Sequence, residues 1–300
     1  MLDVVHQVLA DFLTPMEGEV RWMYQDHLGL VTVGIGNLID SPEAAWATRD
    51  YGAPFLHGGD PAREAAEPQV REAWQAVKKD PSLAGRWPLA EHLSDLRLSA
   101  DGVRNLVRNR LVEYEQTLYG FAEFAGHDSW PADAQLALAS MTWAMGAAFA
   151  EDWPNLRAAC AARRWLAAAS ECNMSNHWML RRNAVDRGLF RNAAWVDATG
   201  ADPTQLYIGI PGNLPTLRLG ASDEQYAGQG YDVDDPVSTL QRFLAFLGHD
   251  APATGTFDAG TDAAVRAFQA NEERLMPGFG VDGVVGRTTW AALGYVVPQY

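Results

Sequence analysis

The stretch EGEVRWMYQDHLGLVTVGIGN, from Glu17 to Asn37, decides the fold of the first half of this 300-residue chain. Aromatic and β-branched residues lie on both sides of a turn that contains glycine, which is typical of a β-hairpin. Glu17 falls where the first helix should end, Asp26 at the hairpin turn and Thr32 on the returning strand. Since other segments of this half are helical, the sequence predicts an α+β, mainly helical fold with a small sheet near its start.

Two carboxylates and a hydroxyl in this order suit the hydrolysis of a glycosidic bond. One carboxylic acid protonates the leaving oxygen, while a second carboxylate directs a water or attacks the sugar. Other roles fit the same residues equally well on spacing alone. Glu17 with Thr14 and Pro15 forms a capping-box pattern, Asp26 is a common turn residue and Thr32 a common strand residue. The pattern by itself leaves both interpretations open.

The rest of the chain divides into helical segments, a connecting stretch and a small module. Apolar residues recur at helical spacing over 98–121, 132–145 and 155–170. Residues 199–232 are rich in Gly, Pro, Asp and Ser and show no period, which predicts a linker. From 233 to 300 the sequence predicts a three-helix domain with a weak repeat, in which Gly255 and Thr261 recur 28 residues later as Gly283 and Thr289.

Charge and composition exclude several classes of partner. The net charge of −15 does not favour nucleic acid, and no apolar run is long enough to cross a bilayer. The start of the chain lacks the basic region of a signal peptide and predicts an amphipathic helix. Cys160 and Cys172 are expected to be buried thiols, because no Cys/His spacing fits a metal. We expect a monomer without metal or cofactor.

The opening stretch resembles the active-site hairpin of phage-type lysozymes, a glycoside hydrolase family of endolysin-like muramidases. The agreement is ungapped and includes Tyr24 and the run Gly34-Ile35-Gly36, together with Glu17, Asp26 and Thr32 at the family's spacing. Later helices are similar to those of the family, including Met145-Gly146 and the pattern Arg181-Arg182-x-x-x-Asp186-x-x-Leu189. The resemblance covers about residues 1–195, with an insertion at about 41–95, and predicts a catalytic domain over 1–198.

This resemblance implies that Glu17 is the general acid, that Asp26 activates a water and that Thr32 hydrogen-bonds that water. The family inverts at the anomeric carbon of the β-1,4 bond between N-acetylmuramic acid and N-acetylglucosamine. The resemblance also implies substrate contacts at Tyr24, Gly36, Asn37, Met145, Gly146 and Arg182. This sequence departs from the family at two positions. Asn37 stands where the family often has His, and Ala144 stands where some members have Gln. In the insertion, Trp46, Tyr51 and Phe55 are candidates to stack on sugars.

Residues 233–300 resemble the peptidoglycan-binding module of many cell-wall hydrolases. The resemblance is carried by Leu240-Gln241, Leu247-Gly248, Phe257-Asp258, Phe268-Gln269, Asp282-Gly283 and Thr289-Trp290. Leu240, Val265, Phe268 and Leu293 are expected to form its core. Residues expected to contact the wall are Asp258, Asp282, Gly283, Thr288 and Trp290.

Together the two resemblances predict a muramidase that is anchored to bacterial peptidoglycan, either an endolysin or a wall-degrading effector. Two alternatives remain: cleavage of the lytic transglycosylase type, which needs one acid and no positioned water, and an inactive wall-binding protein. We expect synthesis in the cytoplasm and action at the wall, after passage through a holin lesion, a secretion machine or lysis.

Overall fold

The computed structural model describes residues 1–175, 179–207 and 213–294. The part of the predicted module beyond residue 294 lies outside this range. The helices in the described residues are α1 (Asp3–Glu17), α2 (Pro42–Ala47), α3 (Glu67–Lys78), α4 (Trp87–Ala90), α5 (Ala100–Leu118), α6 (Ala132–Met145), α7 (Pro154–Ala161), α8 (Trp165–Glu171), α9 (Leu180–Thr199), α10 (Asp223–Tyr226), α11 (Pro236–Phe246), α12 (Ala259–Leu275) and α13 (Arg287–Leu293).

The strands form two small antiparallel sheets. One has the order β1 (Val20–Gln25), β2 (Val31–Gly34), β3 (Asn37–Leu38), and the other pairs β4 (Leu56–His57) with β5 (Leu96–Arg97). The predicted α+β, mainly helical fold is therefore confirmed. None of the described helices is long and apolar enough to cross a bilayer.

The chain forms two compact units, residues 6–114 and residues 1–5 with 115–300. In the first unit, the predicted hairpin follows α1 directly. Tyr24 pairs with Thr32 and Gln25 with Val31, and an irregularity in the register precedes Tyr24. All four residues of β2 are buried, so this strand is the centre of the sheet and part of the core of the unit.

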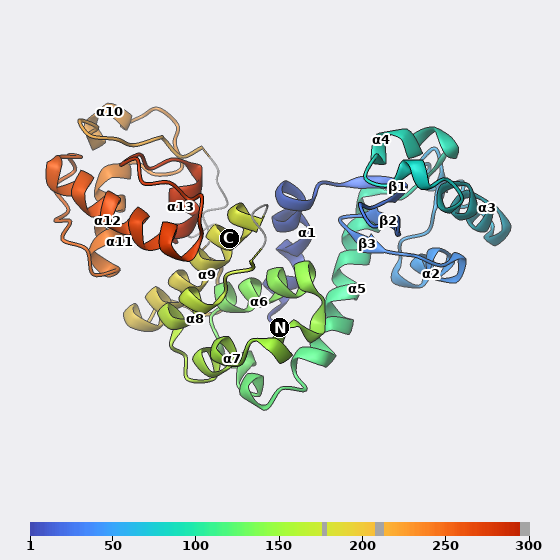
Figure 1. Cartoon of the computed structure of the whole chain (residues 1–300), viewed down its shortest axis with the longest axis horizontal. Coiled ribbons are helices and arrows are strands. Elements are labelled where there is room, and N and C mark those ends of the chain that lie inside the picture. The colour runs from blue at the N-terminus through green and yellow to red at the C-terminus, as the bar shows by residue number, and fades with distance from the viewer. Residues whose placement is uncertain (176–178, 208–212, 295–300) are drawn as a thin grey trace. The chain divides into compact units, whose positions relative to one another are not determined.

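The insertion at 41–95 folds against the hairpin in the same unit, where α3 and α4 pack on β1 (Figure 1). The buried side chain of Gln25 donates to the carbonyls of Val77 (2.6 Å) and Asp80 (2.9 Å), just where α3 ends. The Gly85 N–H donates to the Asp26 carbonyl at 3.0 Å. The insertion therefore supports the turn that carries Asp26.

The aromatic residues of the insertion have different environments. Phe55 is 2% exposed and belongs to the core, so the expectation that it stacks on sugars is wrong for this conformation. Tyr51 hydrogen-bonds Glu113, and Trp46 lies under the Arg49 guanidinium at 4.5 Å. Both are only half-buried, which leaves them as candidates for stacking.

In the second unit, α6 is buried along nearly its whole length and packs against α9, which also contacts α8 (Figure 1). Such a helix shows no one-sided apolar pattern because every face meets protein. Cys160 and Cys172 are buried and free, as expected. Burial raises the pKa of both thiols, that of Cys172 to about 12.

The C-terminal helices α11, α12 and α13 share a core that includes Leu240, Val265, Phe268 and Leu293, as predicted. A pair of buried glutamines explains the internal repeat. The Gln241 side chain accepts from the N–H of Gly255 and donates to the Thr261 hydroxyl. Gln269, 28 residues later, bonds Gly283 and Thr289 in the same way. Each glutamine thus fixes one glycine turn to the start of the helix that follows.

The expectation of a linker over 199–232 is wrong for its second half, because Leu217 and Ala221 belong to this core. Residues 208–212 of the expected linker lie outside the described residues. Leu217 is fully buried and exchanges two backbone hydrogen bonds with Val285, at 3.1 and 2.9 Å. The Pro215 carbonyl accepts from the Trp290 indole at 2.9 Å. The segment lacks a sequence period because it pairs through two isolated bridges, Leu217 with Val285 and Ser222 with Thr256, and these leave no repeating apolar pattern.

A buried ion cluster joins α9 to α12. Glu272 is 1% exposed and accepts from Arg187 (2.7 Å) and Arg191 (2.7 Å). Burial alone would raise the pKa of Glu272, but the charge of Arg191 and the hydrogen bonds from both arginines outweigh it and lower the pKa. Near the cluster, Gly188 of α9 meets the end of α13 so closely that a Cβ there would lie 2.0 Å from the Ala291 carbonyl oxygen.

We expect Glu272→Gln to destabilise the protein by about 3–5 kcal/mol, because it leaves two buried guanidinium groups without a counter-charge. Urea unfolding measures the change, with Glu224→Gln as control. Glu224 is exposed on α10, so its substitution should shift the free energy of unfolding by less than about 0.5 kcal/mol. Equal stability of the two variants would contradict a buried charged cluster.

Candidate active site and wall-binding module

Glu17 is the last residue of α1 and is exposed, immediately before Gly18 in the left-handed region (φ +77°). The alternative capping role is wrong, because Thr14 and Pro15 lie inside the last turn of this helix. The Thr14 hydroxyl donates to the Ala10 carbonyl at 2.8 Å and its carbonyl accepts from Gly18 at 2.9 Å. A carboxylate at the C-terminal end of a helix meets the negative end of the dipole. Helix stability therefore does not explain why Glu17 is there.

Asp26 opens the turn between β1 and β2. Its Oδ1 accepts from the N–H groups of Leu28 (2.8 Å) and Leu30 (2.9 Å). The turn role suggested by the sequence is thus confirmed, and it occupies one carboxylate oxygen. Within the residues that the structure describes, Oδ2 makes no hydrogen bond, so this oxygen is available to a water.

The pKa of the Tyr24 phenol responds to the charges of both Glu17 and Asp26. Burial, followed by the charges of Glu17 and Asp26, raises the pKa of Tyr24 to about 12. Both carboxylates therefore lie close enough to the phenol to disfavour its ionised form. Glu17 and Asp26 thus both lie within electrostatic range of Tyr24.

Thr32 joins this group through the strand register. It pairs directly with Tyr24, and paired residues of antiparallel strands point to the same face of the sheet. Its side chain is 4% exposed, and its hydroxyl donates to the Leu30 carbonyl over a long 3.3 Å. A hydrogen bond of that length is weak, so the hydroxyl can exchange it for a better acceptor.

Gly36 and Asn37 lie at the turn from β2 to β3. Gly36 is exposed with φ +71°, a conformation that favours glycine. Asn37 pairs with Val33 and is buried, and neither polar atom of its side-chain amide finds a hydrogen-bond partner among the described residues. No described hydrogen bond joins Asn37 to Glu17, Asp26 or Thr32.

Met145, Gly146 and Arg182 belong to the other unit. Met145 ends α6, and Gly146 (φ +83°) closes the helix with an N–H bond to the Thr142 carbonyl at 2.8 Å. Arg182 is 4% exposed and donates to the Ser140 carbonyl at 2.9 Å. It also faces the fully buried Asp186, whose pKa burial raises to about 7 against the lowering charge of Arg182. Arg182 therefore ties α9 to α6.

Most of the residues expected to contact the wall have structural partners. Asp258 caps α12 by accepting from the Thr261 N–H at 2.8 Å, and Asp282 accepts from Gln269 at 2.9 Å. Gly283 adopts φ +72° beside Gln269. Trp290 is 2% exposed, while Thr288 is half-buried at the start of α13. Within the described residues, the side chain of Thr288 makes no hydrogen bond.

Sequence reasoning missed a pocket between α9 and α11, which Trp195, Phe243 and Phe246 line together with acidic residues. The run Asp232 to Asp235 was a signal for it, but the first residue fell in the expected linker. The described residues hold no cluster of His, Cys, Asp and Glu placed to bind a metal ion.

Comparison with known proteins identifies the C-terminal part. Residues 233–293 match a family described as putative peptidoglycan binding domain. A search of curated proteins found no match to the chain. The protein therefore carries a peptidoglycan-binding module, which supports peptidoglycan as its partner and an association with the cell wall.

Substitution of Asp26 tests its role in the turn. Asn keeps an oxygen acceptor for the turn, so Asp26→Asn should unfold within about 0.5 kcal/mol of the wild type, whereas Asp26→Ala should lose about 1–2 kcal/mol with its two bonds. Urea unfolding gives both values. If Asp26→Asn were as unstable as Asp26→Ala, the turn geometry described here would be wrong.

Proposed function

We propose that this protein is a peptidoglycan hydrolase that cleaves the β-1,4 bond between N-acetylmuramic acid and N-acetylglucosamine. The observation that carries the proposal is the hairpin turn, where Asp26 bonds two N–H groups through Oδ1 and the register places Thr32 opposite Tyr24. The charges of Glu17 and Asp26 both act on the phenol of Tyr24 and raise its pKa. Two carboxylates near one position are the minimum that glycoside hydrolysis requires. The wall-binding module supports the choice of polymer.

In this proposal Glu17 is the general acid. Its proton passes to the glycosidic oxygen as the bond to the anomeric carbon of muramic acid breaks. A water held by Asp26 Oδ2 and the Thr32 hydroxyl attacks that carbon from the opposite face and gives its proton to Asp26. The product is a muramic acid reducing end of inverted configuration, and a free hydroxyl remains on the leaving glucosamine.

The arrangement of Asp26 favours hydrolysis over transglycosylase cleavage. Hydrolysis needs a second carboxylate with an oxygen free for water, and Oδ2 meets this need while Oδ1 holds the turn. A transglycosylase needs only the acid. In an inactive wall-binding protein neither Glu17 nor Asp26 would take part in a reaction. The experiments distinguish hydrolysis from both of these alternatives.

The module has a complementary part in the proposal. A protein of net charge −15 gains no long-range attraction to an anionic wall. Binding through the module keeps the catalytic unit at a high local concentration near its substrate. In this proposal the protein acts at the wall, after its release or delivery.

Glu17→Gln should lose at least about a hundredfold of the rate at which the protein clears suspensions of permeabilised bacteria, because the amide has no acidic proton to donate. Glu19→Gln is the matched control. It removes the same charge two residues away, where Glu19 pairs with Arg21 at 2.6 Å, and should retain wild-type clearing. Equal clearing by wild type and Glu17→Gln would exclude Glu17 from the reaction.

A further inference from the structure

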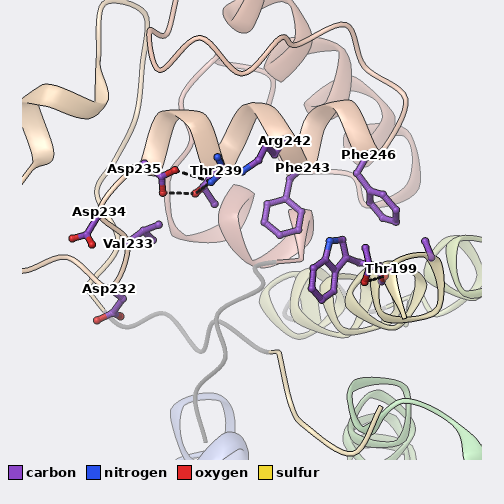
Figure 2. A pocket seen from close by; sticks show the side chains of 11 residues that line it. Thr199, Asp232, Val233, Asp234, Asp235, Thr239, Arg242, Phe243 and Phe246 are labelled. Carbon is purple, nitrogen blue, oxygen red and sulfur yellow. Dashed lines mark hydrogen bonds and ion pairs between the residues drawn. The ribbon is translucent and has the colours of Figure 1, made fainter. Parts of the chain in front are cut away.

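A pocket of about 560 Å³ lies between α9 and α11, within the unit that contains the module (Figure 2). Its apolar part consists of Trp195 from α9 and of Phe243 and Phe246 from α11. Figure 2 shows Phe243 and Phe246 pointing from α11 towards α9. The Trp195 ring is fixed by an edge contact with Tyr207, with centroids 5.4 Å apart. A concave aromatic surface of this size suits a small or extended ligand.

Acidic residues surround one end of this aromatic surface. Asp232, Asp234 and Asp235 line the pocket just before α11, and Arg242 is the basic residue of the lining. Figure 2 shows this acidic end on the side where α11 begins. Arg242 and Asp235 neutralise each other through a 2.8 Å ion pair. In the described part of the chain, the exposed carboxylates of Asp232 and Asp234 have no cationic partner.

This combination selects for a particular chemistry. An aliphatic chain that ends in an ammonium group places its methylenes on aromatic rings and its charge against carboxylates or ring faces. A neutral sugar would stack on the rings but would leave two carboxylates uncompensated. An anion would be repelled. The lining therefore favours an alkylammonium group.

We propose that this pocket binds the side-chain ammonium of the diamino acid in the peptide stems of peptidoglycan. This inference rests on one part of the proposed function, namely that peptidoglycan is the substrate. Free stem amines are cationic groups of an otherwise anionic polymer, so the pocket offers this acidic protein a local attraction. Trp195 lies outside the matched module, so the binding site combines α9 with the module.

The test uses the full-length Glu17→Gln variant as the protein. Its ligands are two fluorescein-labelled synthetic stem peptides. One carries a free side-chain ammonium, and the other has this ammonium acetylated. Fluorescence polarisation should show binding of the free amine at least tenfold tighter than that of the acetylated peptide. Added salt should reduce this preference.

Two sets of variants assign the binding to the pocket. Asp232→Asn with Asp234→Asn should weaken binding of the free amine at least tenfold, and Phe246→Ala should weaken binding of both peptides. The control, Glu224→Gln with Asp250→Asn, makes the same change in net charge at exposed residues outside the pocket lining and should bind like the parent. Thermal unfolding of each variant checks that it is folded.

Equal affinity for the two peptides, no binding of either, or wild-type affinity of the Asp232/Asp234 variant would overturn the proposal. Clearing of bacteria by the wild-type chain is measured in parallel. Clearing without amine-dependent binding would exclude the proposed ligand of the pocket and would still support the hydrolase. Amine-dependent binding without clearing supports the pocket and removes the hydrolase.

Discussion

The turn that Asp26 closes between β1 and β2 is the constraint on which the candidate active site depends. Two backbone N–H groups held by one carboxylate oxygen fix where β2 begins, and this register places Thr32 opposite Tyr24. A slip of one residue would send Thr32 to the other face of the sheet. Gly18 turns the chain out of α1 so that Glu17 precedes the hairpin directly. The insertion adds a second support, because Gln25 is bonded to the end of α3 and Gly85 to Asp26 itself. The positions of Asp26 and Thr32 are thus set by the geometry of one turn and the strand register that follows from it.

A different constraint connects the module to the rest of its unit. Leu217 and Ala221 from the segment before α11 belong to the module core, and the Arg187–Glu272–Arg191 cluster bridges α9 and α12. Removing charges from water is costly, so such a cluster persists only where several hydrogen bonds satisfy it. The close approach at Gly188 adds a steric requirement at the same contact. The module is therefore packed against α9. This packing also creates the pocket between α9 and α11, which neither element forms alone.

Local patterns predicted local structure well. The hairpin from Glu17 to Asn37, the buried helix at 132–145 and the core of the module follow from periodicity and turn residues that lie close together in the chain. Contacts between distant residues had no such signal: Arg187 and Glu272 are separated by 85 positions. The expectation that Phe55 stacks on sugars is wrong because its burial depends on residues that are distant in the sequence. Trp290 and Asp258 match a family motif, yet one fills the core and the other caps a helix. A motif records which residues recur, and structural residues recur as faithfully as binding ones.

The central claim is that Glu17 protonates the glycosidic oxygen while Asp26 directs a water to the anomeric carbon of muramic acid. Mass spectrometry of peptidoglycan digested by the wild-type protein in ¹⁸O-labelled water tests it most directly. The account predicts soluble fragments whose muramic acid ends are reducing and carry one ¹⁸O atom. Fragments that end in 1,6-anhydromuramic acid without the label would contradict it, because the neighbouring hydroxyl of the sugar would then have replaced water as the nucleophile.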